Sequence, residues 1–209
     1  MYVEMNKVSK TMKRKPVLRD VTVGFDRARI YGIVGPNGSG KTMLLRSICG
    51  FIRPDAGTIT IDGMPVVFNQ KLPDSVGVII ENPGFVLSQT GMQNLEYLAG
   101  INHAFDGDEV DRLLGIFGLD RQKDEKVATY SLGMRQKLGV VQALMERQNL
   151  ILLDEPTNGL DERSVQIFIN EMKHQRDQGR TIIIASHHKD ELQQMADRLY
   201  TIADGQLGQ

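Results

Sequence analysis

Three features are scarce in this sequence, and each scarcity excludes a class of protein. Cys49 is the single cysteine among 209 residues, so no internal disulfide can form. Its apolar, helical context predicts a buried thiol in a reducing compartment. The longest apolar runs, such as 76–80 and 150–153, fall far short of the ~20 residues that span a bilayer. The formal net charge is −1, which gives no general attraction to nucleic acid or to anionic lipid.

The N-terminal residues 1–4 include no basic stretch followed by an apolar core, so we expect no secretory signal and a cytoplasmic protein. If the protein works at a membrane, it must dock on a partner that spans it. The apolar fraction of 41% and the charged fraction of 24% are typical of soluble globular proteins. The length predicts one domain over residues 1–209.

Short apolar segments alternate with amphipathic ones along most of the chain, which predicts an α/β fold with a mainly parallel core sheet. The first thirty residues indicate antiparallel strands. The other predicted strands are residues 30–34, 57–63, 76–80, 150–153, 181–185 and 199–203, and the predicted helices outside the central block are 42–48, 162–175 and 190–196.

A helical block from about 83 to 146 interrupts this alternation, and we interpret it as an inserted α-helical subdomain. Thr90 and Gln93 have the spacing of a capping box, and Ser131 is placed to cap a further helix. The antiparallel strands at the start predict a separate β subdomain. Lys7, Lys10, Lys13, Arg14 and Lys15 gather there, and because no aromatic side chains interleave with them, we interpret them as a solvated edge.

A glycine-rich segment with the spacing G-x-x-x-x-G-K-[ST] lies between the predicted strand 30–34 and the predicted helix 42–48. Glycines let backbone N–H groups and a helix N-terminus approach phosphates closely, Lys41 can reach the outer phosphates, and the Thr42 hydroxyl can bind magnesium. This pattern predicts a P-loop NTPase. The residues predicted to bind ATP are Gly35, Pro36, Asn37, Gly38, Ser39, Gly40, Lys41, Thr42 and Met43.

Two carboxylates follow the predicted strand 150–153. We expect Asp154 to hold Mg²⁺ and Glu155 to act as general base on the attacking water. Glutamate ordinarily titrates near pH ~4.3, and we expect burial beside the phosphates to raise the pKa of Glu155 and make it a stronger base.

Three further segments make the chain similar to ABC transporter ATP-binding subunits. Residues 130–136, Tyr-Ser-Leu-Gly-Met-Arg-Gln, resemble the signature motif of that family, and 158–161 resemble its D-loop. Ser186-His187 resembles its switch histidine. The five elements occur in the family's order, and the resemblance covers the chain from about 17 to 207.

The resemblance implies a head-to-tail dimer in which ATP lies between the phosphate loop of one subunit and the signature motif of the other. The signature residues would be Ser131, Leu132, Gly133 and Met134. His187 would contact the γ-phosphate, and Asp161 would couple the two sites. The implied partners are a second ATPase subunit, as homodimer or heterodimer, and an integral membrane permease, with the chain peripheral on the inner face of the cell membrane. No nucleic-acid partner is implied.

Three departures from the common family pattern are informative. Leu132 and Met134 replace a glycine and a glutamine, and Glu81 stands where a glutamine usually binds Mg²⁺. These variants resemble the branch that exports bacitracin and lantibiotic-type peptides. The aromatic residue that stacks on adenine is missing near Met12, and Tyr2 is one candidate replacement.

We therefore predict an ATPase that powers an ABC transporter, with export as the favoured direction. An alternative is a soluble ABC-type ATPase that acts on nucleic acid or ribosomes. Such proteins usually have coiled-coil arms or a second cassette, and this chain has neither. A regulatory module that binds ATP without hydrolysing it is disfavoured by Glu155 and His187.

Overall fold

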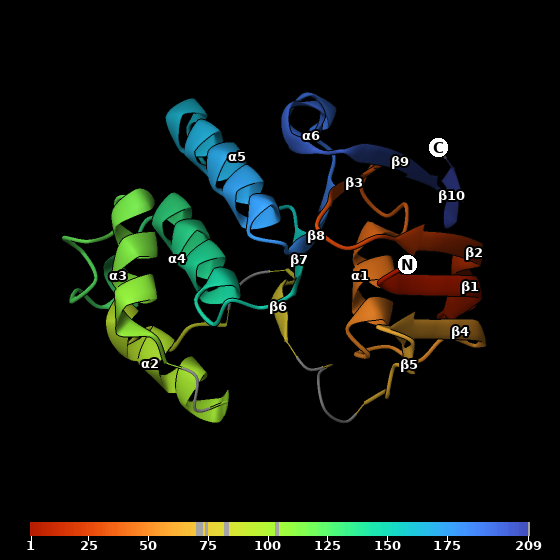
Figure 1. Ribbon diagram of the computed structural model, residues 1–209, viewed down its shortest axis with the longest axis horizontal. Helices are drawn as coiled ribbons and strands as arrows, with labels where there is room; N and C mark the ends of the chain where they lie inside the picture. Colours follow the sequence, from red (N-terminus) through yellow and green to blue (C-terminus); the bar gives the residue numbers. More distant parts are fainter. Residues whose placement is uncertain (70–72, 74, 82–83, 103–104, 209) are drawn as a thin grey trace.

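The computed structural model describes residues 1–69, 73, 75–81, 84–102 and 105–208; Pro83, at the start of the predicted helical block, lies outside them. The described residues form two sheets, six α-helices and one short 3₁₀ helix, Val127–Thr129 (Figure 1). The strands are β1 (Val3–Met12), β2 (Lys15–Phe25), β3 (Ile30–Val34), β4 (Ala56–Ile61), β5 (Met64–Pro65), β6 (Val76–Ile79), β7 (Leu150–Asp154), β8 (Thr181–Ser186), β9 (Arg198–Ala203) and β10 (Gln206–Gly208).

The larger sheet has the order β10-β9-β3-β8-β7-β6. Its neighbours pair in parallel except for β10 on β9. The residues of β7 and β8 are all buried, as expected for strands covered on both faces. The smaller sheet, β2-β1-β4-β5, is antiparallel. The predicted mainly parallel core and antiparallel β subdomain are therefore confirmed.

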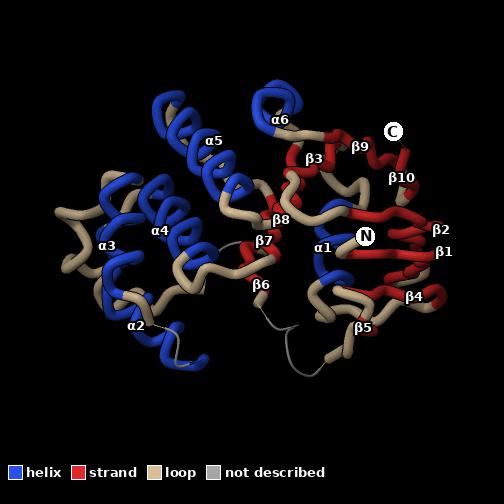
Figure 2. Tube along the Cα trace, viewed as in Figure 1, coloured by secondary structure: helices blue, strands red, loops and turns tan. Residues whose placement is uncertain are grey.

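Three α-helices and the short 3₁₀ helix lie between β6 and β7 in the sequence, and in space the α-helices form the end of the molecule opposite the antiparallel sheet (Figure 2). The predicted capping box is present, since Thr90 N donates to Gln93 Oε1 at 3.0 Å and Gln93 N donates to Thr90 Oγ1 at 3.1 Å. The inserted α-helical subdomain is thus confirmed. Its helices are α2 (Gly91–Asn102), α3 (Gly107–Ile116) and α4 (Leu132–Leu144).

The remaining helices cover the larger sheet. They are α1 (Lys41–Ile48), α5 (Glu162–Asp177) and α6 (Lys189–Met195). Figure 1 shows α1 between the two sheets, with α5 on the side of the larger sheet that faces the helical subdomain. Cys49 is 1% exposed at the end of α1, and burial raises the pKa of its thiol to about 12, so it is a structural residue. None of the helices in the described part of the chain is long and apolar enough to cross a membrane.

Candidate functional site

The glycine-rich loop connects the end of β3 to the start of α1. Gly38 and Gly40 have φ of 80° and 116°, which glycine adopts without strain. A Cβ on Gly40 would lie 2.6 Å from the carbonyl oxygen of Val17, so a larger residue cannot fit there. Gly40 is the N-cap of α1 and supplies no side-chain hydrogen bond. The N-terminus of α1 can therefore offer its backbone N–H groups to an anion.

Lys41 is the first residue of α1, and its side chain folds back inside the loop. It is 5% exposed, and its Nζ donates a hydrogen bond to the carbonyl oxygen of Gly35 at 2.6 Å. The same Nζ lies 3.2 Å from Glu155 Oε1. One ammonium group thus connects the loop to the predicted base.

Thr42 and Asp154 form the predicted magnesium pair. Thr42 Oγ1 donates to Asp154 Oδ2 at 2.6 Å, across the ends of α1 and β7. Asp154 is 6% exposed, and burial raises the pKa of its carboxyl group above the ordinary value. Its other oxygen, Oδ1, is buried and has no hydrogen-bond partner among the described residues. An orphaned carboxylate oxygen beside a threonine hydroxyl fits a Mg²⁺ ligand set.

Glu81 follows β6 and lines one cavity together with Thr42 and Asp154, but its carboxylate is paired with an arginine. Glu81 Oε1 lies 2.7 Å from Nη2 of Arg46, which is in the last turn of α1. Sequence reasoning missed Arg46. Its position five residues after Lys41 places it on the predicted helix that begins at the loop. The described residues contain no cluster of three histidine, cysteine or acidic side chains that would enclose a metal ion.

The Glu155 carboxylate is held by groups from two segments, Lys41 at the start of α1 and Ser186-His187 at the end of β8. Its Oε2 lies 2.8 Å from His187 Nδ1 and accepts a hydrogen bond from Ser186 Oγ at 3.2 Å. Burial alone would raise the pKa of Glu155, but the contacts with His187 and Lys41 outweigh burial and hold the pKa below its usual value. The expected rise in this pKa is therefore wrong for this structure. These contacts favour the ionised form of the carboxylate.

The glycine-rich loop, Glu81 and the acidic pair Asp154-Glu155 surround a cavity of about 450 Å³. The residues that line it are Met12, Lys15, Val17, Asn37, Gly38, Gly40, Lys41, Thr42, Met43, Glu81, Asp154 and Glu155. Sequence reasoning placed Met12 at the base-binding end but missed Lys15 and Val17. The β1–β2 hairpin brings Lys15 and Val17 to the cavity, because Met12 pairs with Lys15 and β2 then runs back along the cavity.

Tyr2 is not the missing aromatic residue. It precedes the first residue of β1, whereas Met12 ends that strand. Ten strand residues extend ~33 Å, so Tyr2 lies far from the cavity. Tyr2 is 4% exposed, and its ring is covered by the guanidinium of Arg27 at 4.0 Å. The suggestion that Tyr2 replaces the missing aromatic residue was wrong, because the two ends of an extended strand lie far apart in space. No aromatic side chain lines the described cavity.

The signature residues lie outside this cavity. Ser131 caps α4, and its Oγ accepts a hydrogen bond from Met134 N at 3.2 Å. Leu132 is 59% exposed, which leaves this turn open to a partner. Asp161 caps α5 in the same way, with Oδ1 accepting from Ser164 N at 2.7 Å. Within one chain, then, both motifs act as helix caps.

Comparison with known proteins identifies the family of the chain. A family profile described as "ABC transporter" matches residues 18–158. The chain belongs to the ABC transporter ATP-binding family. It is 38% identical to the uncharacterized ABC transporter ATP-binding protein YybJ of Bacillus subtilis (strain 168), over 98% of this chain and 94% of that protein.

Two other members of the family extend the comparison. The bacitracin transport ATP-binding protein BcrA of Enterococcus faecalis is 34% identical over 98% of this chain, which spans 67% of that protein. The solved dimeric structure of the bacterial ABC transporter cassette MJ0796 superposes with a TM-score of 0.88, covering 99% of this chain and 97% of that one. At 22% identity, the second likeness concerns the fold alone.

Proposed function

We propose that this chain binds and hydrolyses ATP and thereby powers an ABC transporter. The carrying observation is the placement of the Glu155 carboxylate between Lys41 and His187, beside the Thr42–Asp154 pair. A cation, a magnesium ligand pair and an ionised base meet at the N-terminus of one helix. Phosphoryl transfer needs this combination, since its catalysis is mostly positioning and charge stabilisation.

Each side chain has a distinct role in this proposal. The loop N–H groups and Lys41 bind the phosphates, so Lys41 exchanges its contact with Glu155 for a phosphate oxygen. Glu155 then orients the attacking water and accepts its proton, while His187 fixes the carboxylate and contacts the γ-phosphate. Mg²⁺ held by Thr42 and Asp154, with Glu81 directly or through water, would neutralise phosphate charge.

A second ATPase subunit would complete the site. Ser131 and Leu132 are exposed and lie outside the cavity, so the γ-phosphate could meet them only from a partner's chain. ATP would close the dimer, and loss of the γ-phosphate would open it, as in any ligand-driven population shift. Asp161, at the start of α5, would couple the two sites.

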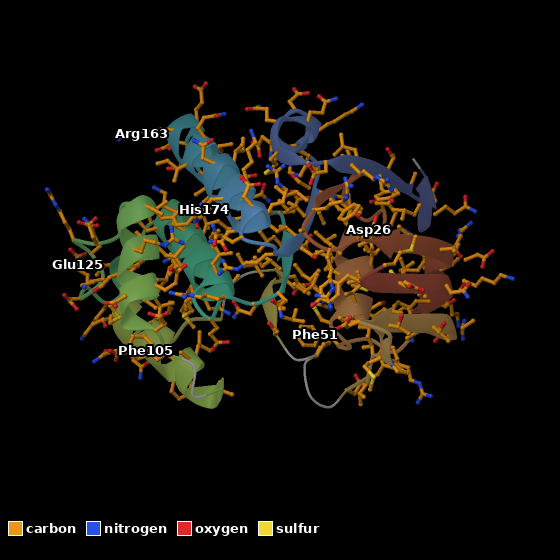
Figure 3. The ribbon with its side chains drawn as sticks, in the orientation of Figure 1. Asp26, Phe51, Phe105, Glu125, Arg163 and His174 are labelled. Atoms are coloured by element: carbon orange, nitrogen blue, oxygen red, sulfur yellow. The ribbon has the colours of Figure 1, made fainter. Side chains whose placement is uncertain are left out.

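The proposed membrane partner is an integral permease. Exposed apolar side chains occur on α2 and on two loops, where Phe51 follows α1 and Phe105 precedes α3. Figure 3 shows these two phenylalanines well apart, with Phe105 at the helical subdomain and Phe51 near the end of α1. Tyr97 and Ile101 on α2 are exposed as well. We propose that the exposed apolar side chains of α2 contact the permease. The likeness to bacitracin transport ATP-binding proteins supports transport of a compound of that kind, and export is the direction that we propose.

The variant Glu155→Gln tests this proposal. We expect it to bind ATP, to lose nearly all hydrolysis, and to accumulate as a closed dimer because the γ-phosphate persists. Size-exclusion chromatography with ATP measures the dimer, and phosphate release measures turnover. Glu125→Gln, an exposed glutamate in the helical subdomain far from β7 (Figure 3), is the matched control and should hydrolyse ATP normally.

The same trapped protein identifies the partner. Affinity purification of tagged Glu155→Gln from detergent-solubilised membranes with ATP should recover an integral membrane protein. Recovery of ribosomes or DNA alone would instead favour the soluble-ATPase alternative. Unchanged turnover in Glu155→Gln would contradict the assignment of the base.

A further inference from the structure

The helix that carries the signature motif also holds the backbone of the predicted catalytic base. Gln136, in the second turn of α4, is 7% exposed. Its Nε2 donates to the carbonyl oxygens of Glu155 at 3.2 Å and Pro156 at 3.0 Å. These residues are nineteen and twenty positions away in the sequence, on the segment that follows β7. One buried amide therefore bonds two consecutive carbonyls of that segment.

The backbone of Glu155 needs such support. Its φ is 47°, in the left-handed region, where a non-glycine residue is strained unless neighbouring groups impose that conformation. Glu155 N donates to Ala185 O at 2.8 Å, and Glu155 O accepts from Asn158 N at 3.2 Å. Gln136 adds the only side-chain bond to this backbone among the described residues, and it is the bond that comes from the helical subdomain.

The first turn of α4 packs against the same segment. A Cβ on Gly133 would lie 2.9 Å from the carbonyl oxygen of Gly159, so the two backbones are in close contact. The side chain of Leu132 covers Gly159, with Cδ2 at 3.0 Å from the position of a Cβ there. Because backbones in such close contact transmit displacement, we expect the start of α4 and residues 155–159 to shift together.

We propose that Gln136 is a positioning residue that joins the signature helix to the backbone of Glu155. The inference rests on the proposed function, in which Ser131 contacts the γ-phosphate of the opposite site. Contact of Ser131 with that phosphate would then fix the position of α4. Through Gln136, α4 would in turn fix the carboxylate of Glu155 in the site of the chain that carries both residues. The base is aligned only when both sites are occupied, which makes hydrolysis cooperative in ATP.

Gln136→Met tests this link because methionine has a similar length and volume but no donor. We expect the turnover number to fall about tenfold to 100-fold, as a small misplacement of a catalytic group does, with KM changed by less than twofold. The Hill coefficient for ATP should fall toward one. Gln142→Met makes the same change on α4 six residues later, away from Glu155, and should leave turnover, KM and cooperativity as they are.

The double variant Gln136→Met/Glu155→Gln separates this inference from the proposed function. If the only role of Gln136 is to position the base, the double variant still forms the ATP-dependent dimer, as Glu155→Gln does. Absence of the dimer in Glu155→Gln itself would count against the proposed function, whereas its absence only in the double variant would show that Gln136 shapes the signature turn and would overturn the inference. Turnover of Gln136→Met within twofold of the parent would overturn it too.

Thermal unfolding establishes that the methionine variant is folded at the assay temperature. If it is not, Gln136→Asn keeps an amide but shortens the side chain by one carbon, which takes the donor away from both carbonyl oxygens. At least a threefold lower turnover with unchanged ATP affinity supports the inference in that variant, and unchanged turnover contradicts it.

Discussion

Two helix N-termini in this protein are expected to face the same kind of ligand, yet they are built differently. The N-terminus of α1 has a glycine cap with no side-chain hydrogen bond and lies inside the cavity. The N-terminus of α4 is capped by Ser131 and is exposed at Leu132. The first cannot satisfy its N–H groups without a ligand or water, whereas the second is partly satisfied within its own chain.

The difference indicates a division of labour. The α1 end has a buried cation, Lys41, beside it, so it can bind the phosphates in a single chain. The α4 end has no buried cation and is a poor anion site until a partner brings the phosphate to it. We therefore expect ATP affinity of the single chain to depend on α1, and turnover of the dimer to depend on both helices.

Removal of the cation from the α1 end should give the largest effect. In Lys41→Ala we expect ATP affinity of the single chain to fall roughly 100-fold or more, because loss of one partner of a buried charge pair costs about 2–5 kcal/mol. Equilibrium binding of a fluorescent ATP analogue measures this. Lys137→Ala removes a lysine from α4 and serves as control. Equal loss in both variants would erase the distinction between the two helices.

Removal of the cap from the α4 end should lower turnover and leave the ATP affinity of the single chain unchanged. In Ser131→Ala we expect unchanged ATP affinity of the single chain and a turnover lowered about tenfold to 100-fold, since a hydrogen bond to a charged group contributes about 1.5–3 kcal/mol. The lost cap should also destabilise the fold by about 1 kcal/mol. Steady-state phosphate release and thermal unfolding measure the two effects.

Asp106→Ala separates the cap from the ligand contact. Asp106 caps α3 by accepting from Glu109 N at 3.1 Å, outside the cavity. Its loss should lower stability as much as Ser131→Ala does and leave turnover intact. If the Ser131 variant loses no more turnover than the Asp106 variant, Ser131 is a structural cap and nothing else.

The smallest expected effect comes from an aromatic side chain introduced at the base-binding end of the cavity, near the N-terminus of α1. Met12 lines the cavity and is 40% exposed, so its thioether can contact a base only weakly. Met12→Tyr should tighten ATP binding about fivefold, the lower range of base–aromatic stacking. Met64→Tyr, at an exposed methionine on β5, is the control. An affinity that does not rise would show that other groups already hold the base.

Much of the fold could be predicted from the sequence because its signals are local. The alternation of buried strands with helices, the capping box at Thr90 and the turn at Asp62-Gly63, where both residues have positive φ, depend on neighbours in the chain. The loop 35–42 is local as well. The errors concern distant contacts, such as the ion pair of Arg46 with Glu81 and the place of Tyr2.

The glycine-rich loop, the acidic pair after β7 and the order of the family motifs were determined by the sequence itself, because each is a run of consecutive residues whose chemistry depends on spacing. Tertiary structure decided the state of those groups. It set the pKa of Glu155 through Lys41 and His187, and it brought Gln136 onto the backbone of Glu155. The physical reason is that charge interactions and buried hydrogen bonds depend on distances in space, which the folded chain fixes between segments far apart in sequence.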